Sequence, residues 1–189
     1  PIVLTFTGGL AVQMATDALQ HFHSNFEPAL RAVYGARLQI RIVGSQPSHR
    51  VKKIVSSAGW QLYADVSDLE LARLLRESTF TILPFPYATG VKLKLVRSLG
   101  SGIPFLSTLA SRFDRLTPPA ACCCSDDPAQ WISTIQKWLA LPDRLAAHKS
   151  LMAEAQKYSW RSTVQSLTEG LAQMKGDNHV IRSISNQSA

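Results

Sequence analysis

The sequence predicts the α/β fold class, with a doubly wound parallel sheet of six strands that has helices on both faces. Short apolar runs alternate with longer amphipathic segments along the chain. Strands that alternate with helices in this way form parallel sheets with right-handed crossovers. The chain has 189 residues, of which 46% are hydrophobic, which suffices for one such domain with a sizeable core.

Six short apolar segments are the expected strands, because strands buried in a parallel sheet are short and apolar. In chain order they are Val3–Thr7, Leu38–Val43, Trp60–Ala64, Phe80–Leu83, Pro104–Ser107 and Ala120–Cys124. The helices expected between them are Leu10–Tyr34, Ser48–Ala58, Asp68–Ser78, Gly90–Gly100 and Pro128–Ala140. The residues expected to cap helices are Asp68, Asp126 and Asp127 at N-termini and Gly35, Gly59 and Gly102 at C-termini.

The C-terminal part contains no further strand candidate. Pro142–Tyr158 and Trp160–Lys175 are predicted to be two closing helices. We therefore expect one domain over residues 1–175, followed by a flexible polar tail over residues 176–189. Because an apolar strand follows Pro1 directly, we interpret the chain as a fragment of a longer protein, cut at a domain boundary.

The composition excludes several classes of protein. Charged residues make up only 17% of the chain, which disfavours a disordered segment or a coiled coil. The apolar runs are too short to span a membrane. The three cysteines, Cys122, Cys123 and Cys124, are adjacent and cannot staple distant segments. A reducing, cytoplasmic location is therefore expected.

The net charge of +7 is concentrated in two stretches, Arg37–Lys53 and Lys92–Arg115. Such clusters suit phosphates, nucleic acid or an anionic membrane surface, and a solvated basic face is the alternative. No aromatic residue interleaves the first stretch, which disfavours nucleic acid as a partner. A solvated basic face and a peripheral contact with the inner face of a membrane are the two interpretations of Arg37–Lys53 that remain open.

The predicted topology also indicates where a ligand binds. Ligands of doubly wound sheets lie beyond the carboxyl ends of the strands, at the point where the strand order reverses. With the expected order 3-2-1-4-5-6, this switch point falls between the first and fourth strands. Gly8 and Gly9 allow close approach of a ligand to the backbone, and the helix expected to open at Gly90 offers free amides to a phosphate. Lys94 and Arg97 share a face of that helix, so both could point along the crevice. Two ordinary solvated cations are the alternative interpretation.

Other ligand signatures are absent. The turn Gly8-Gly9-Leu10-Ala11-Val12-Gln13 lacks the glycine spacing of a dinucleotide-binding loop, and the chain has no P-loop motif. His21 and His23 would point in different directions on a helix, so they do not predict a metal site.

The stretch from Gly90 to Thr108, GVKLKLVRSLGSGIPFLST, resembles the signature of GT-B-fold glycosyltransferases of the family 4 type. That signature has Gly, a variable triplet, Lys, two apolar residues, Glu-Ala-Met-Ala, any residue, Gly, any residue, Pro-Val-Val and Ser/Thr-Thr. Leu38–Gly44, Asp65–Leu69 and Tyr158–Trp160 are similar to other family segments in the same order. The resemblance covers about Pro1 to Lys175.

This resemblance implies a Rossmann-like domain that binds a nucleoside-diphosphate sugar, the C-terminal half of a retaining glycosyltransferase without its N-terminal acceptor domain. The acceptor would be a glycan or a lipid-linked molecule, as in polysaccharide biosynthesis, and no metal or other cofactor is expected. The implied donor-binding residues are Gly8, Gly9, Asp65, Val66, Thr89, Gly90, Val91, Lys92 and Lys94. Lys94 and Arg97 are the expected catalytic residues, since they could stabilise the departing phosphate. The isolated chain is expected to be inactive.

The sequence departs from the family pattern at two glutamates, which Thr89 and Arg97 replace. Arginine has no acceptor atom, so it cannot accept from ribose hydroxyls as the second glutamate does, but it could clamp a phosphate. The family's basic pair after the first strand is also missing, because Thr7–Asp17 contains no basic residue. The alternative interpretation is therefore a catalytically degenerate, non-enzymatic module that binds nucleotides or acts as a scaffold.

Overall fold

A computed structural model of the chain describes residues 1–87, 93–112 and 118–158. Its strands form one six-stranded parallel sheet in the order β3-β2-β1-β4-β5-β6, which confirms the predicted fold class. The strands are β1 (Ile2–Gly9), β2 (Leu38–Ser45), β3 (Gln61–Ala64), β4 (Phe80–Leu83), β5 (Phe105–Ser107) and β6 (Cys123–Cys124). The α-helices are α1 (Gln13–Asn25), α2 (Glu27–Tyr34), α3 (His49–Ser57), α4 (Asp68–Arg76), α5 (Leu93–Gly100), α6 (Pro128–Leu139) and α7 (Arg144–Gln156). Two 3-10 turns, η1 (Gly35–Arg37) and η2 (Leu109–Ser111), complete these elements.

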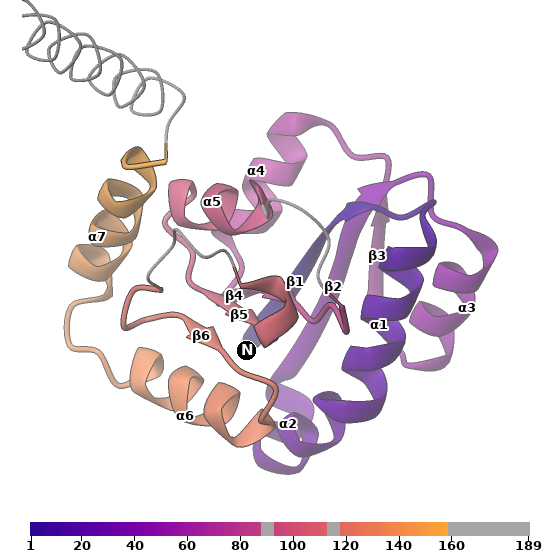
Figure 1. Ribbon diagram of the computed structural model, residues 1–189, viewed down its shortest axis with the longest axis horizontal. Coiled ribbons are helices and arrows are strands. Elements are labelled where there is room, and N and C mark those ends of the chain that lie inside the picture. The colour runs from indigo at the N-terminus through magenta and orange to yellow at the C-terminus, as the bar shows by residue number, and fades with distance from the viewer. Residues whose placement is uncertain (88–92, 113–117, 159–189) are drawn as a thin grey trace, which may run out of the picture.

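Helices cover both faces of the sheet (Figure 1). On one face α1 packs against α3, and α2 packs against α6. On the other face α5 packs against α7, and α4 leads from β3 back to β4. Because the chain reverses direction along the sheet after β3, the loops that follow β1 and β4 diverge and leave space at the carboxyl edge.

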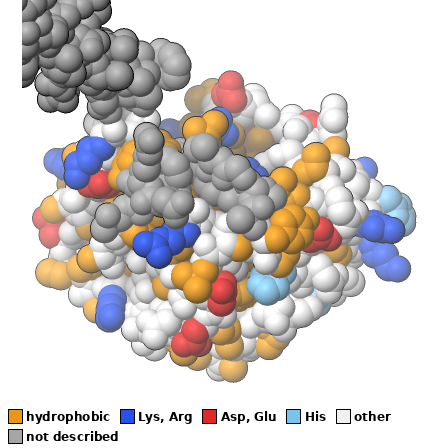
Figure 2. Space-filling view, in the orientation of Figure 1, with side chains coloured by type: hydrophobic (Ala, Val, Ile, Leu, Met, Phe, Trp, Pro, Cys, Tyr) orange, Lys and Arg blue, Asp and Glu red, His pale blue; other side chains and the backbone are white. Residues whose placement is uncertain are grey.

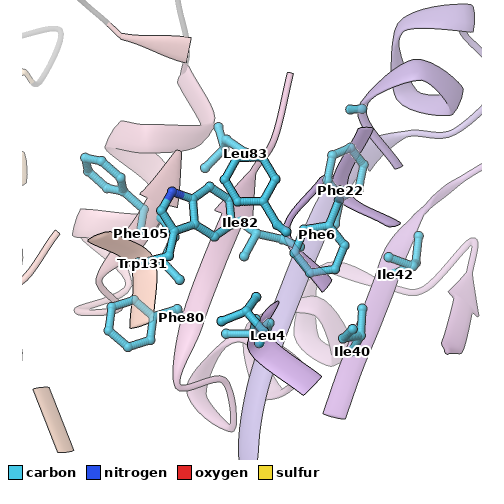
Figure 3. Close-up of a cluster of buried hydrophobic side chains, with 14 of the residues drawn as sticks. Leu4, Phe6, Phe22, Ile40, Ile42, Phe80, Ile82, Leu83, Phe105 and Trp131 are labelled. Carbon is cyan, nitrogen blue, oxygen red and sulfur yellow. The ribbon is translucent and has the colours of Figure 1, made fainter. Parts of the chain in front are cut away.

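The core lies between the sheet and these helices. Large side chains such as Phe6, Ile42 and Phe80 project from the strands, and Trp131 of α6 lies among them (Figure 3). The Trp131 ring stacks on Phe26, with ring centroids 4.2 Å apart. Tight aromatic packing of this kind fixes α6 against the opening helices and makes the sheet a rigid support for its loops.

The prediction of a single helix over Leu10–Tyr34 is wrong, because two helices lie there. Helix α1 begins at Gln13, and the helical segment is interrupted at Phe26, between α1 and α2. Pro28 explains the break, since it has no amide hydrogen and its ring would collide with the preceding turn of a continuous helix.

Two residues expected to cap helices do not do so in the structure. Ser67, not Asp68, caps α4 by accepting from the amide of Glu70. Asp127 caps α6 as predicted, whereas Asp126 accepts from the amide of Leu109 instead.

The sixth strand is shorter than Ala120–Cys124. A turn closed by the Cys122 amide and the Pro119 carbonyl occupies its first half, because the backbone must turn there before it can pair with β5. The three glycines expected at helix C-termini, Gly35, Gly59 and Gly102, all have positive φ angles, as left-handed caps require.

The remaining sequence predictions concern residues outside the described part of the chain. They are the helix opening at Gly90, the closing helix Trp160–Lys175 and the tail over residues 176–189. Among the described residues no helix is long and apolar enough to cross a membrane.

Candidate functional site

A cavity of about 460 Å³ opens at the carboxyl ends of β1, β2 and β3. Its lining comes from five places: the end of β1, the end of β2, the loop after β3, the start of α4 and the start of α5. The lining residues are Thr7, Gly8, Gly9, Val43, Gly44, Ser45, Asp65, Val66, Asp68, Leu71, Leu93, Lys94 and Arg97. Six residues named from the sequence as donor-binding or catalytic therefore meet around one cavity: Gly8, Gly9, Asp65, Val66, Lys94 and Arg97.

The floor of the cavity depends on the close approach of two glycines. Gly8 of β1 is paired with Gly44 of β2. A Cβ atom added at Gly44 would collide with the carbonyl group of Gly8, so only glycine fits there without a backbone shift. By contrast, a Cβ at Gly9 would meet nothing within 4 Å. The open surface over Gly9 is therefore available to a ligand.

Lys94 extends from α5 over the end of β1. A Cβ at Gly8 would lie 2.5 Å from the Lys94 Nζ, so the absence of a side chain at Gly8 makes room for this ammonium group. The Nζ also lies 5.3 Å from the centroid of the Phe6 ring and 5.0 Å from that of Phe85. The rings hold the cation at the cavity through their negative faces.

Arg97 lies one turn further along α5, on its exposed side. The opposite side of the helix carries Leu95 and Leu99, which are buried as the helical spacing predicts. Ser98 is also buried and donates to the carbonyl of Ile103. This anchoring fixes α5 against the sheet and leaves Lys94 and Arg97 on the cavity side.

The loop after β3 forms the other side of the cavity. Asp65 has φ +53°, in the left-handed region that aspartate tolerates better than most residues. Its Oδ1 accepts from the amide of Gln46 at 2.8 Å, and its own amide donates to the carbonyl of Gly44 at 3.0 Å. These bonds fix the ends of β2 and β3 together and place Val66 and Asp68 at the cavity.

Two charged side chains of the cavity, those of Asp68 and Arg97, have no protein partner among the described residues. Within the ranges that the structure describes, they form neither a hydrogen bond nor an ion pair. A guanidinium and a carboxylate without protein partners remain available to a ligand, the first as a donor and the second as an acceptor.

The loop that leads from β4 to α5 is tied to α1. The Tyr87 hydroxyl donates to Asp17 Oδ2 at 2.6 Å, and Gln13 donates to the other oxygen at 2.7 Å. These bonds lower the pKa of Asp17, with the bond from Tyr87 as the largest cause, and the same bond raises the pKa of Tyr87. The described start of the loop is thereby held beside the β1 side of the sheet.

Four other residues predicted to bind the donor, Thr89, Gly90, Val91 and Lys92, lie outside the described residues. Their roles stay predictions. Gly44 and Asp68 were not among the site residues predicted from the sequence. A signal for Gly44 was present in the short strand ending LQIRIVG, but its pairing with Gly8 depends on strand register.

The cysteines and the first basic stretch lie elsewhere. Burial raises the pKa of Cys122 to about 12, which disfavours a nucleophilic role for this thiol. Among the residues that the structure describes, no cluster of three or more His, Cys, Asp or Glu side chains could hold a metal ion.

In the first basic stretch Arg41 pairs with Glu77. Figure 2 shows Lys, Arg and His side chains gathered where α3 lies in Figure 1, and this helix carries Arg50, Lys52 and Lys53 on its exposed side.

Several solved glycosyltransferase structures share this fold at low sequence identity. The catalytic domain of cholesterol-α-glucosyltransferase from Helicobacter pylori matches 84% of this chain and 100% of its own, with a TM-score of 0.56 and 13% identity. HepE from Anabaena, in complex with UDP and glucose, matches 90% of this chain and 48% of its own, with a TM-score of 0.63 and 13% identity. The UDP-forming α,α-trehalose-phosphate synthase from Burkholderia vietnamiensis matches 93% and 45%, with a TM-score of 0.58 and 15% identity.

This chain thus spans less than half the length of the last two proteins. No curated protein sequence matches it significantly. The family model described as glycosyl transferases group 1 matches residues 1–140, which include β1 to β6 and the whole described lining of the cavity. The chain therefore belongs to the glycosyl transferases of group 1.

Proposed function

We propose that the chain is the nucleotide-sugar-binding part of a retaining glycosyltransferase, which transfers a sugar from a nucleoside diphosphate to a glycan or a lipid-linked acceptor. The observation that carries this proposal is the placement of Lys94 and Arg97 at a cavity floored by Gly8 and Gly9. Family membership gives the reaction class. HepE, which shares the fold, was solved with UDP and glucose.

The charges of the cavity suit the chemistry of this transfer. As the bond between the sugar carbon and the phosphate oxygen breaks, its electron pair passes to the leaving diphosphate. A new bond forms between that carbon and the acceptor oxygen, which loses its proton. Lys94 is held over Gly8 and the rings of Phe6 and Phe85, where its ammonium group would stabilise the negative charge that grows on the leaving diphosphate. Cations fixed in advance lower the barrier more than cations that must reorient.

Arg97 contributes a second, more adaptable cation. Its guanidinium is exposed at the cavity and can bind two phosphate oxygens at once. The missing basic residues after β1 would thus be offset from α5, across the crevice. Under this proposal the replacement of a glutamate by Arg97 changes how the diphosphate is held and does not abolish its binding.

The acceptor site would belong to another part of the enzyme. The chain spans 43–49% of the length of the trehalose-phosphate synthases and HepE, which share its fold. About half of an enzyme of that length would lie outside this sequence. Exposed apolar side chains at the carboxyl edge, Val12, Leu93 and Leu109, offer a surface for it. We therefore expect the chain alone to bind donor without transferring sugar.

The second candidate is a non-enzymatic nucleotide-binding or scaffolding module, and Arg97 in the place of a glutamate is the observation that favours it. Both candidates are tested by a thermal-shift screen with UDP, GDP and ADP, since a ligand that binds only the folded state raises the unfolding temperature. The proposal expects at least one of them to do so at millimolar concentration. No shift with any nucleoside diphosphate would contradict donor binding and favour a scaffold. Sugar transfer by the chain joined to an acceptor domain would then distinguish the enzyme from a module that only binds nucleotides.

A further inference from the structure

The Asp68 side chain is a carboxylate at the cavity that forms no hydrogen bond or ion pair with the rest of the described protein. It is the first residue of α4, exposed, and it lines the cavity together with Leu71 one turn later. Ser67 already caps the helix, so Asp68 is not needed for that purpose. Throughout the described part of the chain its side chain has no hydrogen-bond or ion-pair partner.

Asp65, the other carboxylate at the cavity, differs in this respect. Its Oδ1 accepts from the amide of Gln46, and its backbone is held by the carbonyl of Gly44. Asp65 therefore shapes the loop between β3 and α4. Asp68 is free to bind a ligand, and an ionised carboxylate can only accept hydrogen bonds. A hydrogen bond between a ligand and Asp68 therefore requires a donor on the ligand.

The two sides of the cavity then orient a nucleoside diphosphate. Lys94 and Arg97 on α5 attract the diphosphate, whereas Asp68 on α4 repels it. In such a ligand the ribose, which carries two neighbouring hydroxyl donors, lies directly next to the diphosphate. Val66 and Leu71 add apolar surface on the same side as Asp68, suited to a flat base.

We infer that Asp68 accepts hydrogen bonds from the ribose hydroxyls, so that the cavity selects ribonucleoside diphosphates over their 2′-deoxy counterparts. This inference rests on the proposed function, because it takes a nucleoside diphosphate as the ligand. Arg97 cannot perform this task, since it lacks an acceptor. Asp68 is thus a specificity-determining residue of the donor site.

The simpler role for Asp68 is electrostatic, because an acidic residue in the first turn stabilises a helix through its dipole. A measurement of affinity alone would not separate the two roles, since removing a negative charge near a diphosphate strengthens binding and so offsets the loss of a ribose contact. The ratio of two affinities does separate them. The ribonucleotide and its 2′-deoxy form carry the same charge, so general electrostatic effects cancel in the ratio.

The experiment is titration calorimetry of the chain with UDP and 2′-deoxy-UDP, and with GDP and 2′-deoxy-GDP. The proteins are the wild type, Asp68→Ala and the matched control Glu70→Ala. Glu70 lies in the same turn of α4 but pairs with Arg73 and does not line the cavity. We expect the wild type and Glu70→Ala to prefer the ribose form about tenfold. Asp68→Ala should bind both forms within about twofold of each other.

Each other result overturns the inference. Equal discrimination in the wild type and Asp68→Ala would show that Asp68 does not contact the ribose, while leaving donor binding intact. A change in the preference between UDP and GDP without a change in the 2′-deoxy ratio would place Asp68 at the base. No binding of any of the four nucleotides would overturn the inference, and no thermal shift with ADP either would overturn the proposed function as well.

Discussion

Two charged regions of this molecule differ in how their side chains are paired. Glu27, at the start of α2, is only 5% exposed, and Trp60 donates to its Oε1 at 2.9 Å. Arg31 donates to the same oxygen at 3.0 Å, and His23 contacts the other at 2.7 Å. At the cavity, in contrast, the side chains of Asp68 and Arg97 have no partner among the described residues.

The difference separates charges that serve the fold from charges that serve a ligand. A charge buried without partners is costly, so Glu27 requires its three donors. A charge at an open cavity stays hydrated and can remain unpaired until a ligand arrives. Mutations in the first region should therefore change stability, and mutations in the second should change binding.

The largest effect is expected for Glu27→Ala. It leaves the indole N–H of Trp60 without an acceptor in a buried site, so the free energy of unfolding should fall by about 3 kcal/mol. Asp68→Ala should cost less than about 1 kcal/mol, the usual contribution of an acid in a first helical turn. Urea denaturation of both variants measures the difference. Similar losses in the two variants would contradict the separation of roles.

A second comparison contrasts two glycines at the cavity floor. Gly44→Ala should destabilise the protein by about 2 kcal/mol, because the new Cβ must displace the backbone at Gly8. Gly9→Ala is the matched control, since its Cβ would meet nothing within 4 Å, and we expect a change within about 0.5 kcal/mol. Thermal unfolding reports both. A costly Gly9→Ala together with a harmless Gly44→Ala would disprove the close approach of β1 and β2.

The contrast between these glycines also shows how far sequence reasoning extends. The apolar strands could be predicted, and so could the placement of Gly8, at the end of β1, and of Lys94, at the start of α5, beside one crevice. Each follows from local pattern and from sheet topology. The pairing of Gly8 with Gly44 depends on strand register, and the unpaired state of Asp68 depends on what surrounds it in space. Neither is encoded in the spacing of nearby residues.

The third prediction concerns Lys94→Ala. Loss of one charge-assisted bond should weaken nucleoside-diphosphate binding by about 1–3 kcal/mol. Lost contacts of the Lys94 ammonium with Phe6 and Phe85 should cost less than about 1 kcal/mol of stability. Titration calorimetry compares this variant with Lys53→Ala, which removes an exposed cation of α3. Equal affinities in the two variants would reduce Lys94 to an ordinary solvated cation.

The smallest effect is expected at the exposed bond between Tyr87 and Asp17. The pKa of Asp17 is lowered in the folded state, so the bond stabilises the fold above the usual aspartate pKa of 3.8. This contribution is lost as the pH falls through the lower, folded-state value. Tyr87→Phe should therefore lower the unfolding temperature slightly near neutral pH and not at strongly acidic pH. A difference that persists in acid would show that Tyr87 acts through packing and not through Asp17.

The most direct test of the account is the affinity of Arg97→Glu for UDP. If the Arg97 guanidinium binds the diphosphate, a carboxylate in its place should weaken the binding of UDP by about tenfold or more. Lys52→Glu, which makes the same change of charge on exposed α3, should leave the affinity within about twofold. A higher affinity in Arg97→Glu than in the wild type would contradict the account, since it would show that the position still serves the ribose.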